Sequence, residues 1–245
     1  MSDHVPRAQT LALHSDPVPH LIVDHLFGDE VAGAIHEHLV GLEDRFAPAG
    51  IAADGRPSSM RKNLSLGVDA CFHEEGDETG ALEERFRRRA ERSVLLGAVD
   101  ALLRSPTWRE VMNGAPFPLC KLAIVNRWET QASRYGAPGD EYRWHIDRID
   151  DDGRLLTIVY YVFEEPRRFE GGDLELVAGL ASDGELLAEG PRVRIEPRND
   201  RAVMFSARAV HRVLPTTAPA TFGAGRFSVN VFCGVAGAPP EGDVY

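Results

Sequence analysis

Three side chains in this sequence have the types and spacing of a metal site. His145 and Asp147 stand two residues apart in the stretch EYRWHIDR. In a β-strand, residues i and i+2 point to the same face, so this imidazole and this carboxylate can approach one common ion. A second histidine, His211, follows another apolar run in RAVMFSARAVHRVLP. On a facing strand it would complete a set of two histidines and one carboxylate, which leaves further positions of a divalent metal open.

The segment GRFSVNVF predicts an anion site in the same cavity. Arg226 and Ser228 alternate with apolar residues, so both project from one face of the predicted strand. A guanidinium buried inside a barrel without a carboxylate partner is costly, which implies that an anion completes the site. The alternative is an exposed arginine on an edge strand.

These side chains need a β-rich scaffold, and the sequence after residue 118 predicts one. Short β-branched and aromatic runs are separated by Gly, Pro and Asp, a pattern typical of a sandwich or barrel. The predicted strands are LCKLAIVNRW, LLTIVYYVF, DLELV, RVRIEP, RAVMFSA and RFSVNVF. Within FEGGDLEL, Gly171 and Gly172 suit a tight turn with unusual backbone angles, a structural role that needs no chemistry.

The first half of the chain predicts helices instead. An apolar, strand-like segment from Pro17 leads into a helical pattern, with Asp29 as its cap. Residues 79–103 have apolar side chains at helical spacing and predict one long amphipathic helix, and SPTWREVMNG predicts a short one capped by Ser105. Residues 47–78, rich in Gly, Pro, Ser and Asp, predict a long loop with one short strand at KNLSLGV, of the kind that closes over a site.

Composition and charge exclude several classes of partner. The chain has 245 residues, of which 43% are hydrophobic and 27% charged, and it lacks the run of about 18 apolar residues that a membrane span needs. A net charge of -11 argues against nucleic acid as the main partner. Three scattered cysteines predict reduced thiols, and the N-terminus does not resemble a secretory signal. We therefore expect a cytoplasmic protein without a membrane partner, and its oligomeric state stays open.

Four segments, in this order, resemble the double-stranded β-helix of the Fe(II)/2-oxoglutarate-dependent dioxygenases, in the prolyl 4-hydroxylase-like branch. They are RYGAPGDEYRWHID, RLLTIVYYVFEEPRRFEGGDLELV, RNDRAVMFSARAVHRVLP and GRFSVNVF. The resemblance covers residues 119–233, and PVPHLIVDHLFGDEVAGAI resembles the lead-in segment of that branch. It implies one structural domain that is mainly β with α additions: a jelly-roll, cupin-like core over 118–235, N-terminal helical support over 1–117 and a tail over 236–245.

The resemblance also implies roles for individual residues. The catalytic ligands of Fe(II), arranged as the facial triad of non-haem iron oxygenases, would be His145, Asp147 and His211. The groups that bind the distal carboxylate of 2-oxoglutarate would be Arg226, Ser228 and Tyr135, the last matching the family's strand tyrosine before HxD.

The implied reaction consumes 2-oxoglutarate and O2, releases succinate and CO2, and hydroxylates an unactivated C–H bond of an amino acid, peptide residue or related small molecule. Stimulation by ascorbate would fit this chemistry. Asp147 argues against halogenation, because halogenating relatives have a small residue at that position. Two alternatives stay open: the same cofactor chemistry ending in desaturation or cyclisation, and a non-catalytic β-sandwich binding protein, against which the complete triad and Arg226 argue.

The substrate is the least determined part of this interpretation. Trp144, Arg148 and Asp150 flank the predicted iron ligands and are candidates for contact with the substrate. The acidic stretch DRIDDDGR favours a neutral or cationic substrate, although it also fits a solvated turn. Phe163 follows YYV where relatives commonly have a polar residue, so the class of substrate stays open.

Overall fold

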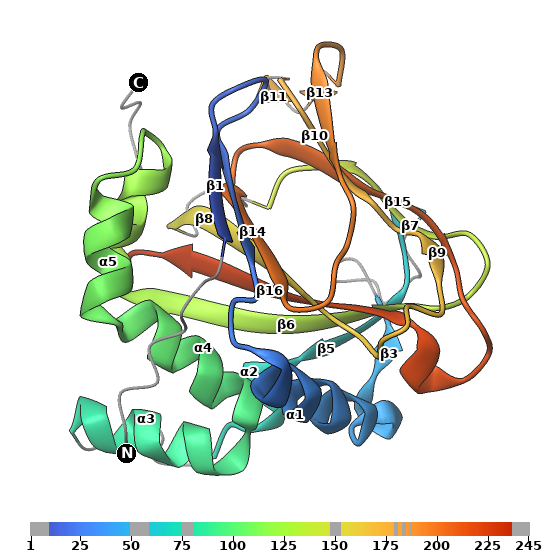
Figure 1. Ribbon diagram of the computed structural model, residues 1–245, viewed down its shortest axis with the longest axis horizontal. Helices are drawn as coiled ribbons and strands as arrows, with labels where there is room; N and C mark the ends of the chain where they lie inside the picture. Colours follow the sequence, from blue (N-terminus) through green and yellow to red (C-terminus); the bar gives the residue numbers. More distant parts are fainter. Residues whose placement is uncertain are drawn as a thin grey trace.

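Two antiparallel β-sheets face each other in this computed structural model, which describes residues 10–49, 59–74, 81–147, 153–178, 181–182, 185–186 and 188–236 (Figure 1). The larger sheet has eight strands in the order β1-β2-β14-β8-β16-β6-β5-β3. Their bounds are β1 Thr10–His14, β2 His20–Asp24, β14 Arg201–Ser206, β8 Arg154–Val162, β16 Arg226–Gly234, β6 Arg127–Tyr135, β5 Leu64–Gly67 and β3 Ala47–Pro48.

The smaller sheet has the order β13-β10-β15-β7-β4, and a further strand, β9, also pairs with β15. The bounds are β13 Arg192–Ile195, β10 Leu174–Val177, β15 Val210–Thr217, β7 Asp140–His145, β4 Arg61–Lys62 and β9 Glu170–Gly171. A separate short pair is formed by β11 Ala181–Ser182 and β12 Glu185–Leu186. Because β1 to β5 come from the first 117 residues, that part of the chain completes both sheets.

The helices lie along one side of the larger sheet, and the smaller sheet lies on its other side (Figure 1). The α-helices are α1 Asp29–Val40, α2 Val68–Cys71, α3 Leu82–Arg92, α4 Val94–Arg104 and α5 Pro106–Asn113. Three short 3-10 helices are η1 Glu43–Arg45, η2 Leu119–Ile124 and η3 Phe222–Ala224. A mainly β architecture with helical additions is therefore confirmed. None of the described helices is long and apolar enough to cross a membrane.

Strand β8 contributes side chains to two separate hydrophobic cores, one on each face of the larger sheet. Ile158 and Tyr160 point to the helices and belong to the core between helices and larger sheet, whereas Val159 and Tyr161 belong to the core between the sheets. Successive side chains of a strand point to opposite faces, so a strand covered on both sides is apolar throughout. This is why LLTIVYYVF is apolar on both faces, apart from Thr157, rather than alternating.

The prediction of one helix over residues 79–103 was wrong, because the chain breaks at Ser93. This residue is extended, with φ -149° and ψ 117°, and its hydroxyl caps α4 by accepting from the backbone N–H of Leu96 at 3.3 Å. The break lets α3 fold back on α4. A Cβ atom at Gly97 would lie 3.0 Å from Cβ of Ala90, so the glycine permits the close approach of these helices.

Other local predictions are corrected in smaller ways. Residues 119–124 form η2 rather than the start of a strand, and Asp29 is the first residue of α1, with Gly28 at the cap position at φ 84°. The short helix after the Ser105 cap is confirmed, since its hydroxyl accepts from the N–H of Trp108 at 3.3 Å. The expected loop over residues 47–78 contains β3, β4, β5 and α2, and its residues 50–58 and 75–78 lie outside the described part of the chain.

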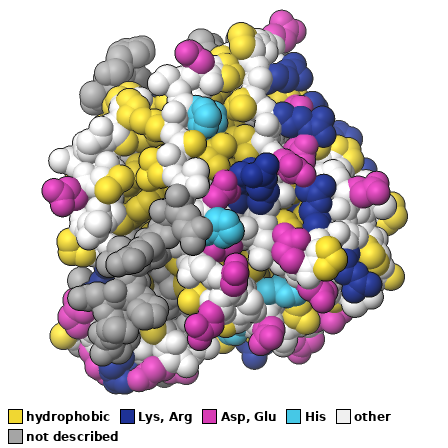
Figure 2. Space-filling view, in the orientation of Figure 1, with side chains coloured by type: hydrophobic (Ala, Val, Ile, Leu, Met, Phe, Trp, Pro, Cys, Tyr) yellow, Lys and Arg dark blue, Asp and Glu magenta, His cyan; other side chains and the backbone are white. Residues whose placement is uncertain are grey.

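The face of the molecule drawn in Figure 2 carries both acidic and basic side chains, on a chain whose net charge is -11. In Figure 2, acidic and basic side chains are interspersed, and the basic ones lie mainly on the side of the smaller sheet. Hydrophobic side chains are exposed on the opposite side of the same view.

Candidate metal and anion site

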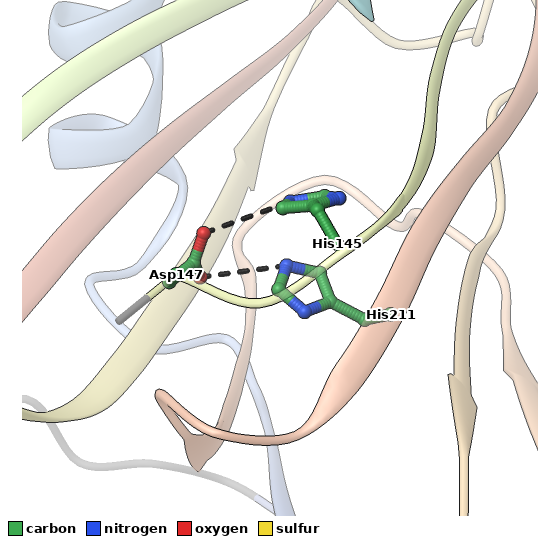
Figure 3. Close-up of side chains that lie close together, drawn as sticks. All are labelled: His145, Asp147 and His211. Carbon is green, nitrogen blue, oxygen red and sulfur yellow. Dashed lines mark ion pairs between the residues drawn. The ribbon is translucent and has the colours of Figure 1, made fainter. Parts of the chain in front are cut away.

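Strands β7 and β15 bring the three predicted metal ligands together. The two strands pair antiparallel, with His211 directly opposite His145. Asp147 follows the end of β7, and its backbone N–H donates to the carbonyl of Ala207 at 3.0 Å. Nε2 of His145 lies 3.6 Å from Oδ1 of Asp147, and Nε2 of His211 lies 3.4 Å from Oδ2 (Figure 3). The three ligand atoms all lie within 4.8 Å of one another.

Backbone carbonyl groups orient both imidazoles. Nδ1 of His145 lies 2.7 Å from the carbonyl oxygen of Arg143, and Nδ1 of His211 lies 2.9 Å from that of Ala209. A carbonyl only accepts, so Nδ1 of each ring carries a hydrogen, and Nε2 is the nitrogen of each ring that is left to bind a metal. The carboxylate is held as well, because the hydroxyl of Thr157 donates to Oδ2 of Asp147 at 2.7 Å.

Burial sets the charge state of the first histidine. Loss of water around His145, reinforced by the neighbouring His211, holds the pKa of His145 well below its usual range. The short distances to Asp147 therefore do not mark an ion pair with this ring. Neutral imidazole is the form that binds metals. Two such nitrogens with one carboxylate match the donor set of non-haem Fe(II) sites.

A cavity of about 270 Å³ opens beside these three side chains. One wall is built by β6 and β16, whose register places Tyr135 opposite Arg226 and Ser133 opposite Ser228. Alternate residues on these strands face the cavity, as the spacing in GRFSVNVF predicts. The cavity therefore joins the metal-type cluster to the predicted anion site.

Arg226 is completely buried and incompletely paired. Its Nη1 donates to the hydroxyl of Ser228 at 3.3 Å, whereas Nε and Nη2 have no hydrogen-bond partner among the described residues. The rings of Tyr135 and Tyr161 lie 4.8 and 4.9 Å from the guanidinium carbon. Since an unpaired buried charge is strongly unfavourable, the geometry fits a site for a carboxylate.

Neutral donors surround the same position. Burial raises the pKa of Tyr135 above its usual range and that of Tyr161 to about 12, so both phenols keep their hydrogen at neutral pH. The hydroxyl groups of Tyr161 and Thr216 are buried without a partner in the part of the chain that the structure describes. Together with Arg226 they form a set of donors that an anion can satisfy.

The two glycines of FEGGDLEL form the expected turn, with φ of 72° at Gly171 and 75° at Gly172. Gly172 has a second role, which the sequence does not indicate: it makes room for the side chain of Arg226. A Cβ atom at this position would lie 2.5 Å from Cδ and 2.9 Å from Nε of Arg226. The missing side chain therefore leaves the room in which the Arg226 side chain lies.

Of the three predicted substrate contacts, the structure describes only Trp144. Trp144, which neighbours His145 on β7, lies beside the guanidinium groups of Arg212 and Arg192, 4.4 and 5.6 Å from its ring, and it is not among the residues that line the cavity. Arg148 and Asp150 fall outside the described residues.

Sequence reasoning missed several residues of this site. Tyr161, Thr157, Thr216 and Arg61 were not singled out, although all four lie at the metal-type cluster, the arginine or the cavity. A period-two reading of LLTIVYYVF would have placed Thr157 and Tyr161 on one face. Arg61 lies on a strand of two residues, too short for any periodic signal.

Comparison with known families and proteins agrees with this geometry. Residues 130–234 match the family described as the 2OG-Fe(II) oxygenase superfamily. The chain is 28% identical over 147 residues to an uncharacterized PKHD-type hydroxylase of Synechocystis, covering 56% of the chain and 46% of the relative. It is 27% identical over 203 residues to human Egl nine homolog 1, covering 80% of the chain and 41% of the relative. The chain thus spans about half the length, or less, of these curated relatives.

Two solved structures share the fold. A prolyl hydroxylase from Trichoplax adhaerens, in complex with a peptide of hypoxia inducible factor, superposes with a TM-score of 0.58 at 20% identity, covering 88% of this chain and 83% of that one. A Pseudomonas putida prolyl-4-hydroxylase superposes with a TM-score of 0.55 at 20% identity, covering 89% and 93%. At this identity the likeness shows a shared jelly-roll core.

Proposed function

This chain belongs to the 2OG-Fe(II) oxygenase superfamily, in its prolyl 4-hydroxylase-like branch, and from that premise we propose that it hydroxylates an unactivated C–H bond of an amino acid, peptide residue or related small molecule. The cofactor of the family is Fe(II), and its cosubstrates are 2-oxoglutarate and O2. The observation that carries the proposal is one cavity with a His-Asp-His cluster on one side and the unsatisfied guanidinium of Arg226 on another.

The residues of the cavity divide into two groups by what they would hold. His145, Asp147 and His211 would bind the iron, which supplies a redox-active centre with open positions for 2-oxoglutarate and O2. Arg226 and Ser228 would bind the 5-carboxylate of 2-oxoglutarate through a charge-assisted contact. The phenols that surround this guanidinium add donors without adding charge.

Support for the class of substrate comes from the neighbours. The Trichoplax protein is a prolyl hydroxylase in complex with a peptide, and the Synechocystis relative is described as a hydroxylase. These descriptions favour hydroxylation of a peptide residue or amino acid. Desaturation and ring closure would use the same iron site. The buried Arg226 with two unpartnered nitrogens favours an enzyme over a binding protein that keeps only the scaffold.

The experiment that tests the proposal supplies the purified protein with Fe(II), 2-oxoglutarate and O2, and measures succinate with and without candidate amino acids and peptides. We expect slow succinate formation from 2-oxoglutarate alone and faster formation with a substrate. Absence of any 2-oxoglutarate-dependent succinate, together with absence of anaerobic 2-oxoglutarate binding, would refute the proposal.

Replacement of His211 by Ala should abolish both iron binding and turnover, because it removes one of three ligands from a site with no spare histidine among the described residues of the cavity. Iron content after reconstitution is the direct measurement. His14→Ala, which removes an exposed imidazole on β1, is the control and should bind iron normally. Full iron content in His211→Ala would contradict the ligand assignment.

A further inference from the structure

A second arginine faces the cavity from the smaller sheet. Arg61, on β4, lines the cavity, and its guanidinium is held by neutral acceptors only. Nε donates to Oδ1 of Asn63 at 2.9 Å, and Nη2 donates to Oε1 of Gln131 at 3.0 Å and to the hydroxyl of Ser133 at 2.8 Å. These acceptors orient the guanidinium without cancelling its charge, and Nη1 has no hydrogen-bond partner within the described ranges.

Other partly buried arginines of this protein either pair with a carboxylate or, like Arg134 and Arg109, donate to backbone carbonyls away from the cavity. Arg212 lies 2.6 Å from Glu175, and Arg201 lies 2.5 Å from Asp24. Arg61 makes no such pair with the described residues. Arg61 differs from both groups because it lines the cavity, where a charge that no described carboxylate cancels can bind an anionic ligand.

Arg61 lies close to the predicted metal ligands. Its guanidinium carbon is 4.9 Å from the centre of the Tyr142 ring. That ring in turn stacks on His145, with centroids 3.4 Å apart and planes 13° apart. The Tyr142 ring is thus the group that separates Arg61 from His145. An anion bound by Arg61 would therefore lie near the His-Asp-His cluster, where a substrate must be placed.

The charges of the proposed cofactors leave Arg61 without a counterion. The two carboxylates of 2-oxoglutarate and the carboxylate of Asp147 balance a divalent metal and Arg226. Two further charged residues line the cavity, Arg154 and Glu129, and they pair with each other at 3.0 Å, while Arg154 also donates to the carbonyl oxygen of Asp147 at 3.1 Å. The positive charge of Arg61 then has no counterpart among the described residues that line the cavity, and burying it beside the other cation and the metal is unfavourable.

We propose that Arg61 binds a carboxylate of the substrate, so that the substrate is an amino acid or a short peptide with a free α-carboxylate. This inference rests on the proposed function, because it assigns the substrate of that same cavity. A carboxylate matches the planar fork of a guanidinium, and the unpartnered Nη1 supplies the donors.

The test compares matched acids and amides. The full chain, loaded with Mn(II) and 2-oxoglutarate without oxygen, is titrated by calorimetry with the free L-amino acids, with short prolyl peptides and with the C-terminal amide of each. Succinate formation by the Fe(II) enzyme is measured with the same compounds. We expect at least one acid to bind about tenfold to a hundredfold more tightly than its amide, the usual range for a hydrogen bond to a charged group.

Arg61→Gln should bring the affinity for the acid down to that of its amide, and Arg61→Lys should retain part of the preference. The affinity for 2-oxoglutarate should fall far less in Arg61→Gln than the affinity for the acid. Lys62→Gln is the matched control, because it removes the same charge from the neighbouring, exposed residue of β4, and it should keep the full preference for the acid.

Three results would overturn the inference: amides that bind the wild-type protein as tightly as acids, no binding by any acid, or an Arg61→Gln variant whose affinity for 2-oxoglutarate falls as much as its affinity for the acid. The last would assign Arg61 to the cosubstrate. The comparison of acids with their amides on the wild-type protein tests the inference even if a variant does not fold. Failure of the proposed function is separate, since it would remove 2-oxoglutarate binding and substrate-independent succinate formation as well.

Discussion

Among single residues, the clearest sign of function is an arginine that the protein buries without satisfying it. Arg226 has 0% exposure and two nitrogens without partners among the described residues. The free-energy cost of burying an unpaired guanidinium is offset where a ligand binds it, as at binding sites for anions. Arg134 and Arg212, two further buried or partly buried arginines, are satisfied elsewhere, by the backbone carbonyls of Phe222 and Thr221 and by Glu175 respectively.

Arg226→Ala should weaken 2-oxoglutarate binding by about thirtyfold to several thousandfold, because loss of one partner of a buried charge-assisted pair costs about 2 to 5 kcal/mol. Arg226→Lys keeps the charge but loses the planar fork, so its affinity should be intermediate. Titration of the anaerobic Fe(II) protein with 2-oxoglutarate, followed by its charge-transfer absorbance, measures this. Unchanged affinity in Arg226→Ala would transfer the role to Arg61 or Arg154, the other arginines that line the cavity.

Gly172→Ala should lower both stability and 2-oxoglutarate affinity, because the new methyl group would displace Arg226 from a distance of 2.5 Å. Gly139→Ala is the matched control. Gly139 has a similar φ of 83°, and a Cβ atom there would meet nothing within 4 Å. Both variants should lose about 1 to 2 kcal/mol of stability from the left-handed backbone, but only Gly172→Ala should bind 2-oxoglutarate at least tenfold more weakly. Equal affinities would show that the Arg226 side chain has other room.

Among the elements, one charged cluster joins three helices to the larger sheet. Asp100 of α4, which is 2% exposed, accepts from Nε of Arg89 on α3 and from the indole N–H of Trp128 on β6, both at 2.8 Å. Arg89 also donates to Asp69 of α2 at 2.5 Å. Burial raises the pKa of Asp100 above its usual range, outweighing these hydrogen bonds. The cluster fixes the position of the helical layer behind the cavity wall.

Arg89→Met should destabilise the protein by about 3 to 5 kcal/mol, because it leaves Asp100 buried and without its cation. The effect should depend on pH. The folded-state pKa of Asp100 is raised above its unfolded value, and loss of Arg89 raises it further, so stability is retained at acid pH and lost as pH rises through the folded pKa. Urea unfolding at pH 5 and pH 8 measures the difference.

The control for this cluster is Arg87→Met on the same helix. Arg87 pairs with Glu84 and Glu91 on the exposed side of α3, and exposed ion pairs contribute little to stability. This variant should therefore be nearly as stable as the wild type at both pH values. Similar losses in the two variants, or a loss in Arg89→Met that does not vary with pH, would contradict the account of Asp100.

In the molecule as a whole, the cavity depends on segments from both halves of the chain. Strand β2 pairs with β14 and β5 pairs with β6 in the larger sheet, while β4 pairs with β7 in the smaller one. The core between the helices and the larger sheet also combines both halves of the chain. Ile35 and Leu39 of α1 belong to one buried cluster with Phe227 and Val229 of β16. We therefore expect the predicted support and core segments to fold as one unit.

A fragment of residues 118–236 should not fold alone, although it contains the predicted iron ligands and Arg226. It would expose the outer face of the larger sheet and the strand edges that β2, β4 and β5 cover. Circular dichroism and sedimentation should show a disordered or aggregated chain. A monomeric fragment with a cooperative unfolding transition would show that the first 117 residues are an independent support.

Local patterns in the sequence were enough to show which side chains share a face. HxD and the alternation in GRFSVNVF are period-two signals, so His145, Asp147, Arg226 and Ser228 could be singled out without a structure. Local spacing cannot say which faces meet, because strand pairing joins residues far apart in the chain. The folded chain was needed to show that His211 lies opposite His145, that Tyr161 in a mostly apolar run faces Arg226, and that Arg61 on a two-residue strand reaches the same cavity.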